Sequence, residues 1–168
     1  MEGEFIIEPL SRRHDREAFC CGVEALDAYL KNQAGQDMRR RVSNCFVATD
    51  AENGAVAAYY TLAAASIPLS ELSHEQVKRL PRYPVLPAAL IGRLAVDRRY
   101  RGIGLGGALL LNAAKRAESS DAAVYALIVD AKDETAERFY VGNGFRALAS
   151  NPRRLFLPIE TARRSLGE

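Results

Sequence analysis

The chain has 168 residues, enough for one compact domain to bury a core without a disulfide or a structural metal. It is 48% hydrophobic and 26% charged, and no apolar run approaches the ~18 residues that suggest a membrane helix. The first residues include acids where a signal peptide would carry basic residues. These features argue against a membrane or exported protein, and we expect one cytoplasmic domain over residues 1–168.

The charge is nearly balanced overall, with a net value of +2, but its distribution is uneven. Most of the 23 basic residues are arginines, whose planar guanidinium can donate two bonds to one phosphate. They gather near residues 39–41, 78–82, 98–101, 153–154 and 163–164. The three cysteines, Cys20, Cys21 and Cys45, lack C-x-x-C spacing, so we expect reduced and mostly buried thiols.

Strand and helix patterns alternate in the first part of the chain. Phe5–Glu8 reads as a short strand and Val23–Arg39 as an amphipathic helix. Two strands are expected at Val42–Thr49 and Val56–Ala65, because Asn53-Gly54 between them is a strong hairpin signal. The chain therefore begins with a strand, a helix and an antiparallel pair.

A capping box is expected at Ser73, with Gln76 as the returning side chain, and it predicts a short helix that ends near Leu80. Prolines at positions 81, 84 and 87 are expected to prevent regular structure after it. A fourth strand is then predicted at Leu90–Val96.

The remaining pattern predicts two more helices and three more strands. The helices are expected at Gly102–Ala117 and Glu134–Val141, and the strands at Val124–Val129, near Phe145–Leu148 and near Leu155–Ile159. This order indicates an α/β domain with a mixed sheet flanked by helices.

The sharpest motif is the glycine-rich segment Arg101–Leu111, which joins an apolar strand to an amphipathic helix. Glycines let a phosphate approach the backbone, and the free amides and positive dipole end of the helix face it. A simple tight turn is the plain alternative. A dinucleotide-binding G-x-G-x-x-G loop is another, but it should come early in the chain, and here only about 60 residues follow.

Two segments resemble the GCN5-related N-acetyltransferases, the GNAT superfamily. Arg101–Gly106 resembles their R/Q-x-x-G-x-G/A pyrophosphate loop, and Ala136–Phe145 resembles their A-x-x-F-Y-x-x-x-G-F segment. Phe19–Leu30, Arg93–Asp97 and Val129–Glu134 are most similar to the acetyltransferase toxins of bacterial type II toxin–antitoxin systems. The resemblance spans nearly the whole chain and implies a mostly antiparallel mixed sheet, splayed between strands four and five.

This resemblance implies acetyl-CoA as co-substrate and no metal. It implies that Tyr140 acts as the catalytic acid near the sulfur and that strand residues pair with the pantetheine amides. Asp133 stands where many relatives carry Asn. The cofactor-binding residues so implied are Leu94, Ala95, Val96, Arg101, Gly102, Ile103, Gly104, Leu105, Gly106, Gly107, Asp133 and Tyr140.

No side chain stands out as a general base, since the two histidines, His14 and His74, lie in polar stretches and are expected to be solvated. An α-amine, with a pKa of about 8, needs a base less than a lysine near 10.4. The toxin resemblance implies such an acceptor, the α-amine of aminoacyl-tRNA, whose acetylation blocks translation.

Lys78, Arg79, Arg82 and Arg93 are the expected tRNA contacts, because phosphate contacts supply affinity without base specificity. The resemblance also implies a ribbon-helix-helix antitoxin, whose tail would cover the basic face. It leaves open which aminoacyl-tRNA is used and whether two chains form a homodimer. Two other functions remain: acetylation of a protein N-terminus or a small amine, and a non-catalytic acyl-CoA-binding regulatory module, against which the presence of Tyr140 argues.

Overall fold

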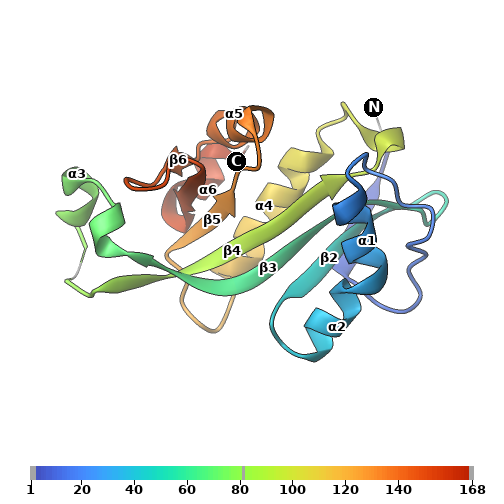
Figure 1. Cartoon of the computed structure of the whole chain (residues 1–168), viewed down its shortest axis with the longest axis horizontal. Helices are drawn as coiled ribbons and strands as arrows, with labels where there is room; N and C mark the ends of the chain where they lie inside the picture. The colour runs from blue at the N-terminus through green and yellow to red at the C-terminus, as the bar shows by residue number, and fades with distance from the viewer. Residues whose placement is uncertain (1–2, 81, 167–168) are drawn as a thin grey trace. The chain divides into compact units, whose positions relative to one another are not determined.

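The computed structural model describes residues 3–80 and 82–166, without the side chain of Arg163. The expected break at Pro81 and the Arg163 side chain therefore lie outside the described residues. Strands and helices alternate along the chain as an α/β protein (Figure 1). The strands are β1 (Phe5–Pro9), β2 (Asn44–Asp50), β3 (Val56–Pro68), β4 (Val85–Val96), β5 (Ala126–Asp130), β6 (Arg146–Ala147) and β7 (Arg154–Pro158).

The sheet is mixed, as the sequence predicted. Its strand order is β1-β2-β3-β4-β5-β7-β6. Strands β4 and β5 pair in parallel. The pairs β1–β2, β2–β3, β5–β7 and β6–β7 are antiparallel. The helices are α1 (Glu24–Asn32), α2 (Ala34–Arg39), α3 (His74–Val77), α4 (Leu105–Glu118), α5 (Glu134–Gly142) and α6 (Ile159–Ser165), with 3-10 turns η1 (Leu69–Glu71) and η2 (Arg98–Tyr100).

The chain divides into two compact units, each made from two stretches of sequence. The first contains residues 1–63 and 92–112, and the second contains residues 64–91 and 113–168. The first unit holds the start of the chain and the glycine-rich segment. The second holds Tyr140 and the end of the chain.

The core of the first unit packs α1 and α2 with β2 and β3. Leu30, Val47 and Tyr59 are fully buried there. The predicted single helix over residues 23–39 is wrong, because the chain leaves helical geometry at Gln33 (φ −122°). Asp37 of α2 then accepts hydrogen bonds from the side chains of Gln33 and Tyr29, and these bonds tie α2 to α1.

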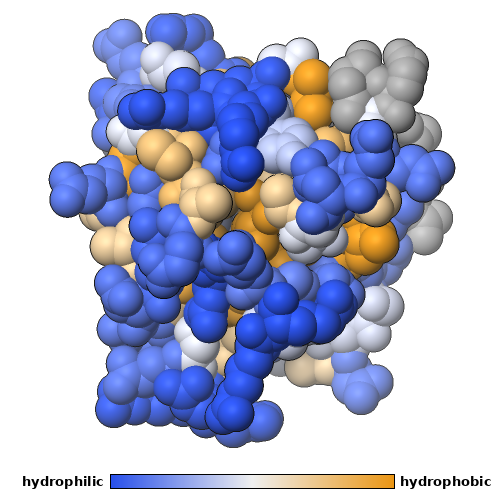
Figure 2. Space-filling view, turned by 90° about the vertical axis from the view of Figure 1, so that its right-hand side faces the viewer, coloured by the Kyte–Doolittle hydropathy of each residue, from blue (hydrophilic) through white to orange (hydrophobic). Residues whose placement is uncertain are grey.

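The outer face of the molecule that contains α1 and α2 is mainly hydrophilic. In Figure 2, its apolar side chains show as small areas separated by hydrophilic ones. Single exposed apolar residues are ordinary on a protein surface, so this face carries no sign of an extended apolar interface.

The core of the second unit packs residues of β4, β5 and β7 around buried Ile67, Ile128 and Phe156. The fourth strand begins at Val85, earlier than the predicted Leu90, and runs through Pro87. Proline lacks an N–H group but keeps its acceptor, and the Pro87 carbonyl accepts a hydrogen bond from the Tyr125 amide at 2.8 Å. The expectation that this proline excludes regular structure is therefore wrong.

The capping box at Ser73 is confirmed, with both reciprocal hydrogen bonds to Gln76, but α3 ends at Val77, before the predicted Leu80. The last helix, α6, was not predicted. It starts directly after Pro158 and buries Ala162, and its few residues carry too little periodicity to be seen in the sequence.

Candidate functional site

The glycine-rich segment forms an open turn before helix α4. Gly102 and Gly104 have φ values of 77° and 85°, in the region that favours glycine. A Cβ at either position would meet nothing within 4 Å. The Ala108 amide donates to the Gly104 carbonyl at 3.1 Å, so the amides of the residues just before it have no partner one turn back. An anion can therefore approach this backbone.

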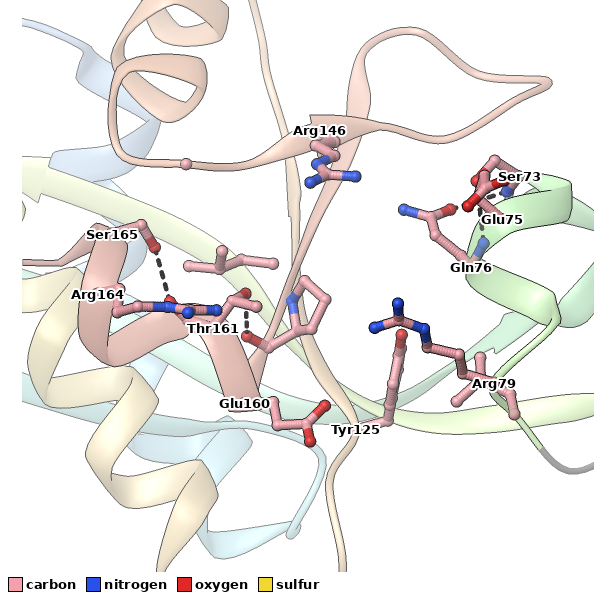
Figure 3. A pocket seen from close by; sticks show the side chains of 14 residues that line it. Ser73, Glu75, Gln76, Arg79, Tyr125, Arg146, Glu160, Thr161, Arg164 and Ser165 are labelled. Atoms are coloured by element: carbon pink, nitrogen blue, oxygen red, sulfur yellow. Dashed lines mark hydrogen bonds between the residues drawn. The ribbon is translucent and has the colours of Figure 1, made fainter.

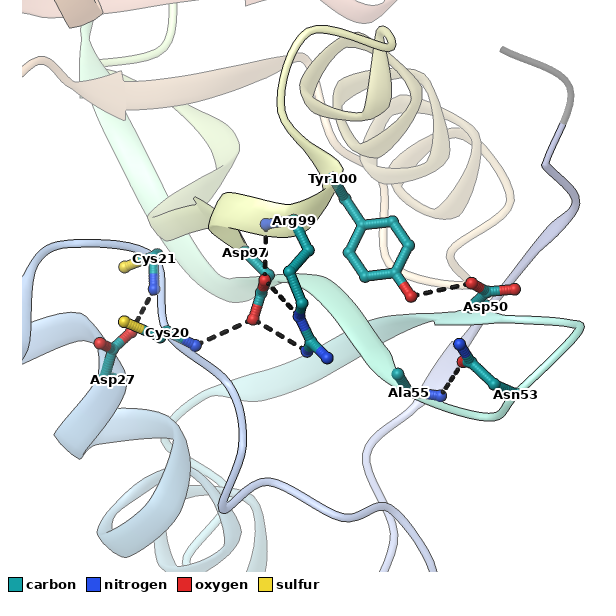
Figure 4. Close-up of polar contacts among 9 residues, drawn as sticks. All are labelled: Cys20, Cys21, Asp27, Asp50, Asn53, Ala55, Asp97, Arg99 and Tyr100. Carbon is teal, nitrogen blue, oxygen red and sulfur yellow. Dashed lines mark hydrogen bonds and ion pairs between the residues drawn. The ribbon is translucent and has the colours of Figure 1, made fainter.

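The buried carboxylate of Asp97 fixes the segment that leads into this turn (Figure 4). Asp97 is 1% exposed and accepts bonds from the Cys20 amide at 2.9 Å and from both the amide and the side chain of Arg99. The Arg98 amide donates in turn to the Cys20 carbonyl at 2.9 Å. The turn is thus fixed against the segment that precedes α1.

The charge of Asp97 is stabilised in place. Burial by itself raises the pKa of this carboxyl, but the bonds from Arg99 and Cys20 outweigh it, and the net pKa lies below its usual range. Asp97 is therefore ionised at neutral pH. The sequence placed Asp97 at the end of a family segment without a role, because its partner Cys20 is far away in the chain.

The Arg101 side chain is hydrogen-bonded within the protein. Its guanidinium donates a hydrogen bond to the Cys21 carbonyl. Gly22 follows with φ 94°, and a Cβ there would lie 2.9 Å from the Arg101 Nη2 atom. Arg101 is thus held at Cys21, beside the turn, and its other N–H donors remain for an anion.

The strand before the turn carries the three residues expected to pair with pantetheine. Leu94 and Val96 are half-buried and Ala95 is buried, at the carboxyl end of β4. The register between β4 and β5 ends at Ile91 with Val129. Among the described residues, the rest of β4 thus has no register partner on β5.

The rest of the predicted cofactor loop follows the same geometry. Ile103 is half-buried in the turn, Leu105 is buried as the first residue of α4, and Gly106 and Gly107 are half-buried in its first turn. Leu105 packs the start of the helix into the core, and the two glycines add no side chains to its first turn.

Tyr140 on α5 is buried, with 8% of its surface exposed, and its ring packs edge-on against Phe139 and Phe145. Burial, with a smaller effect of Asp130, raises its pKa to about 12. The hydroxyl makes no hydrogen bond to any described residue, yet no fully buried side-chain oxygen among these residues lacks a partner. The hydroxyl oxygen therefore reaches the surface as an unused, protonated donor.

Asp133 acts as the N-cap of α5. Its carboxylate accepts a hydrogen bond from the Ala136 amide at 2.8 Å, which starts the helix that carries Tyr140. One of its oxygens is thus committed to the helix.

The four expected RNA contacts differ in their surroundings. Lys78 and Arg82 are exposed, and Arg79, also exposed, lines a cavity in the second unit. Arg93, in the first unit, is half-buried, and its guanidinium carbon lies 3.6 Å from the centre of the Tyr29 ring. Arg93 is thus held by a cation–π contact.

The expectation that both histidines are solvated is wrong for His14, which is 6% exposed. Its Nδ1 accepts a hydrogen bond from the Ser11 amide at 3.0 Å, so its Nε2 donates to Glu8 at 2.9 Å. His74 is exposed at the start of α3. His14 is a structural link between β1 and the loop after it.

The three cysteines form no disulfide, and Cys21 and Cys45 are buried while Cys20 is exposed. Burial raises the pKa of Cys45 to about 12. Within residues 3–80 and 82–166, no group of histidine, cysteine or acidic side chains is arranged to hold a metal. No helix in the same part of the chain has the length and apolar character needed to cross a bilayer.

The sequence and structure of known proteins place the chain in a family. Residues 86–156 match the model of the acetyltransferase (GNAT) domain. The probable toxin TacT of Sinorhizobium fredii is 34% identical over 172 residues, covering 96% of this chain and 95% of that protein. A tRNA-acetylating toxin of Mycobacterium tuberculosis is 32% identical over 170 residues, covering all of both chains.

Solved structures of toxins have the same fold. AtaT complexed with acetyl-methionyl-tRNAfMet has a TM-score of 0.87 and 28% identity, covering 96% of this chain and 98% of that one. A Tyr-to-Phe mutant of AtaT, bound to the C-terminus of the antitoxin AtaR and acetyl-CoA, has a TM-score of 0.78 and 25% identity, covering 98% and 99%. The chain therefore belongs to the GNAT acetyltransferases, the superfamily that its glycine-rich turn and the segment around Tyr140 resemble.

Proposed function

We propose that this chain works as a single acetyltransferase domain that transfers an acetyl group from acetyl-CoA to the α-amine of aminoacyl-tRNA. The observation that carries the proposal is its match, along its whole length, to a tRNA-acetylating toxin. The unused hydroxyl of Tyr140 and the open turn at Gly104 supply what such a reaction needs.

The turn and the end of β4 fit acetyl-CoA. The pyrophosphate lies against Gly102, Gly104 and the free amides that open α4, where a side chain would otherwise project. The backbone of Leu94–Val96 pairs with the pantetheine amides. Arg101, hydrogen-bonded to the Cys21 carbonyl beside the turn, adds a charge-assisted bond to the phosphates.

Tyr140 donates a hydrogen bond to the departing sulfur. Its pKa of about 12 keeps the phenol protonated at any physiological pH. A thiol has a pKa of about 8.5, so complete transfer of the phenol proton to the thiolate is uphill. Tyr140 therefore stabilises the negative charge that develops on sulfur, and the net proton comes from the amine nitrogen as the amide forms.

The acceptor amine needs no dedicated base under this scheme. An α-amine with a pKa of about 8 is partly neutral at pH 7. Of the two histidines, His14 is already bonded to Ser11 and Glu8. A substrate whose amine deprotonates readily in water suits a site of this kind.

We further propose that acetylation blocks translation in the cytoplasm, and that a ribbon-helix-helix antitoxin neutralises the chain. The AtaT structure with the C-terminus of its antitoxin AtaR supports the second statement. Expression of the chain alone should arrest growth, and the Tyr140→Phe variant at equal abundance should not. Normal growth with abundant active enzyme would count against the toxin role.

The direct test is incubation of the purified chain with labelled acetyl-CoA and total aminoacyl-tRNA. We expect label on the amino acid of one or a few tRNA species, identified by mass spectrometry after ester hydrolysis. Equal labelling of a free peptide or a polyamine, with none on aminoacyl-tRNA, would overturn the proposal in favour of a peptide or small-amine acetyltransferase.

A further inference from the structure

The second unit contains a hollow of about 800 Å³ lined by residues of α3, β6, β7 and α6 and of the loops beside them, among them Tyr125 just before β5 (Figure 3). Arg79, Arg146 and Arg164 come to it from three separate segments, and Figure 3 shows their guanidiniums around a shared opening. Tyr125 and Glu160 lie at one side of the same hollow. It is distinct from the glycine-rich turn, which belongs to the first unit.

The three arginines of this hollow have no hydrogen bond or ion pair with any described residue. Two other arginines of the unit are paired, since Arg154 bonds Asp130 at 2.8 Å and Arg153 lies 3.6 Å from Glu137. Three unpaired guanidiniums around one opening form an electropositive site for an external anion, although Glu75 and Glu160 reduce its net charge.

Aromatic surface accompanies these cations. Tyr125, half-buried, lines the hollow directly, and burial and Glu160 raise its pKa while Arg146 lowers it. Arginines together with accessible tyrosine rings are typical of nucleic-acid surfaces, where rings stack on bases and guanidiniums bind phosphates.

The hollow extends from Tyr125, away from the reacting hydroxyl, to Gly144, which follows the helix that carries Tyr140. Tyr125 precedes β5, whereas Asp130, which influences Tyr140, ends it. A strand of this length spans roughly 17 Å. The Tyr125 end of the hollow is thus placed to bind the backbone of a long ligand rather than its acetylated amine.

We propose that Arg79, Arg146 and Arg164 form a binding site for the phosphodiester backbone of RNA. The inference rests on the proposed function and extends it, because the sequence indicated neither Arg146 nor the hollow as part of the RNA surface. An acidic protein segment is the competing occupant. The ring of Tyr125, which lines the hollow, favours RNA, because it offers a base a stacking surface.

The test is fluorescence anisotropy of labelled, deacylated total tRNA with the full chain over a range of salt concentrations. Arg146→Glu and Arg164→Glu should each weaken binding about tenfold at low salt and lower the salt slope by about 1. Arg12→Glu, the same charge reversal at an exposed position of the first unit, is the matched control. Arg146→Gln, without reversed charge, should give a smaller loss, and thermal unfolding should show all variants folded.

The outcomes separate this inference from the proposed function. If wild-type chain acetylates aminoacyl-tRNA, and reversal of Arg146 and Arg164 changes RNA affinity no more than Arg12→Glu, the site is wrong and the function stands. If no acetylation of aminoacyl-tRNA occurs while RNA binding depends on these arginines, the function is wrong and the site stands. If reversal of Arg146 and Arg164 abolished binding to a labelled polyglutamate peptide but left the RNA affinity unchanged, the RNA assignment would be overturned.

Discussion

Four buried tyrosines divide between the two units in an informative way. In the first unit, the hydroxyls of Tyr29, Tyr59 and Tyr60 donate to Asp37, the Leu26 carbonyl and Asn112, at 2.7, 2.6 and 2.7 Å. In the second unit, the hydroxyl of Tyr140 has no such partner among the described residues. Burial raises the pKa of both Tyr29 and Tyr140 to about 12, so acidity does not separate them.

The difference between the units lies in how each hydroxyl is used. A buried hydroxyl is costly unless it is hydrogen-bonded, and the first unit satisfies its hydroxyls within the fold. Tyr140 leaves its donor at the surface of an otherwise buried ring. The three satisfied hydroxyls contribute to folding, and the unsatisfied one is available to a substrate.

The largest effect should come from removing that available hydroxyl. Tyr140→Phe keeps the ring contacts with Phe139 and Phe145 and removes only the donor. Turnover should fall by about 10² to 10⁴ because the departing sulfur loses its hydrogen bond. The free energy of unfolding and the affinity for acetyl-CoA should hardly change, since no bond within the fold is lost. Steady-state kinetics measure turnover, and calorimetry measures the acetyl-CoA affinity and the free energy of unfolding.

Tyr59→Phe is the matched control for this prediction. It removes a hydroxyl that donates to a carbonyl in the core, so it should destabilise folding by about 1 to 3 kcal/mol. Turnover per folded molecule should be unchanged. The comparison of the two units would fail if Tyr140→Phe lowered stability as much as Tyr59→Phe, or if it turned over like wild type.

The next largest effect concerns the open turn of the first unit. Gly104→Val puts a branched side chain into the space where the phosphates are proposed to lie. Acetyl-CoA affinity should fall roughly 10- to 100-fold, the equivalent of one lost charge-assisted hydrogen bond.

Gly54→Val separates this loss from backbone strain. Gly54 also has a positive φ, 75°, and open space around its Cβ, but it lies in the hairpin between β2 and β3. Both valines should destabilise folding by about 1 to 2 kcal/mol. Only Gly104→Val should reduce acetyl-CoA affinity in calorimetry, and equal affinities in the two folded variants would rule out the phosphate assignment.

Local chemistry made part of this structure visible in the sequence. The turn glycines, the capping box at Ser73 and the hairpin at Asn53 each depend on a backbone requirement that few residues satisfy, so their letters identify them. The alternation of strands and helices was enough to predict a mixed sheet, though it did not give the strand order.

Features that depend on distant partners were missed or mistaken. His14 is buried because Glu8 and Ser11 satisfy its ring, and β4 passes through Pro87 because its carbonyl pairs with Tyr125. Neither partner can be chosen from spacing alone. The hollow at Arg146 likewise combines residues between positions 73 and 80 with residues between positions 125 and 165, and no short motif records such a combination.

A smaller effect should appear in the pH profile. Because the pKa of Tyr140 is about 12, its proton remains in place through pH 10. The acceptor amine, with a pKa of about 8, should instead govern the profile, so kcat/KM should rise about tenfold from pH 7 to 9. Initial rates with aminoacyl-tRNA measure this rise, and a fall between pH 9 and 10 would show that Tyr140 titrates as an ordinary tyrosine.

The smallest effect tests the satisfied side of the comparison, at Tyr29. Its hydroxyl bond is the first cause of the lowered pKa of Asp37, followed by the bond from Gln33. Tyr29→Phe keeps the ring beneath Arg93, so the pKa of Asp37 should rise toward its ordinary value without a change in turnover.

The sign of this change can be followed by carboxyl NMR titration of Asp37. A carboxyl with a lowered folded pKa contributes stability above its unfolded pKa, and this is lost as pH falls through the folded pKa. In Tyr29→Phe the bond with Asp37 is absent, so the folded pKa is higher and the loss on acidification is smaller. Tyr59→Phe should leave the Asp37 titration unchanged, since its hydroxyl bonds the Leu26 carbonyl. An unchanged Asp37 pKa in Tyr29→Phe would mean that this hydroxyl, like that of Tyr140, is not committed to the fold.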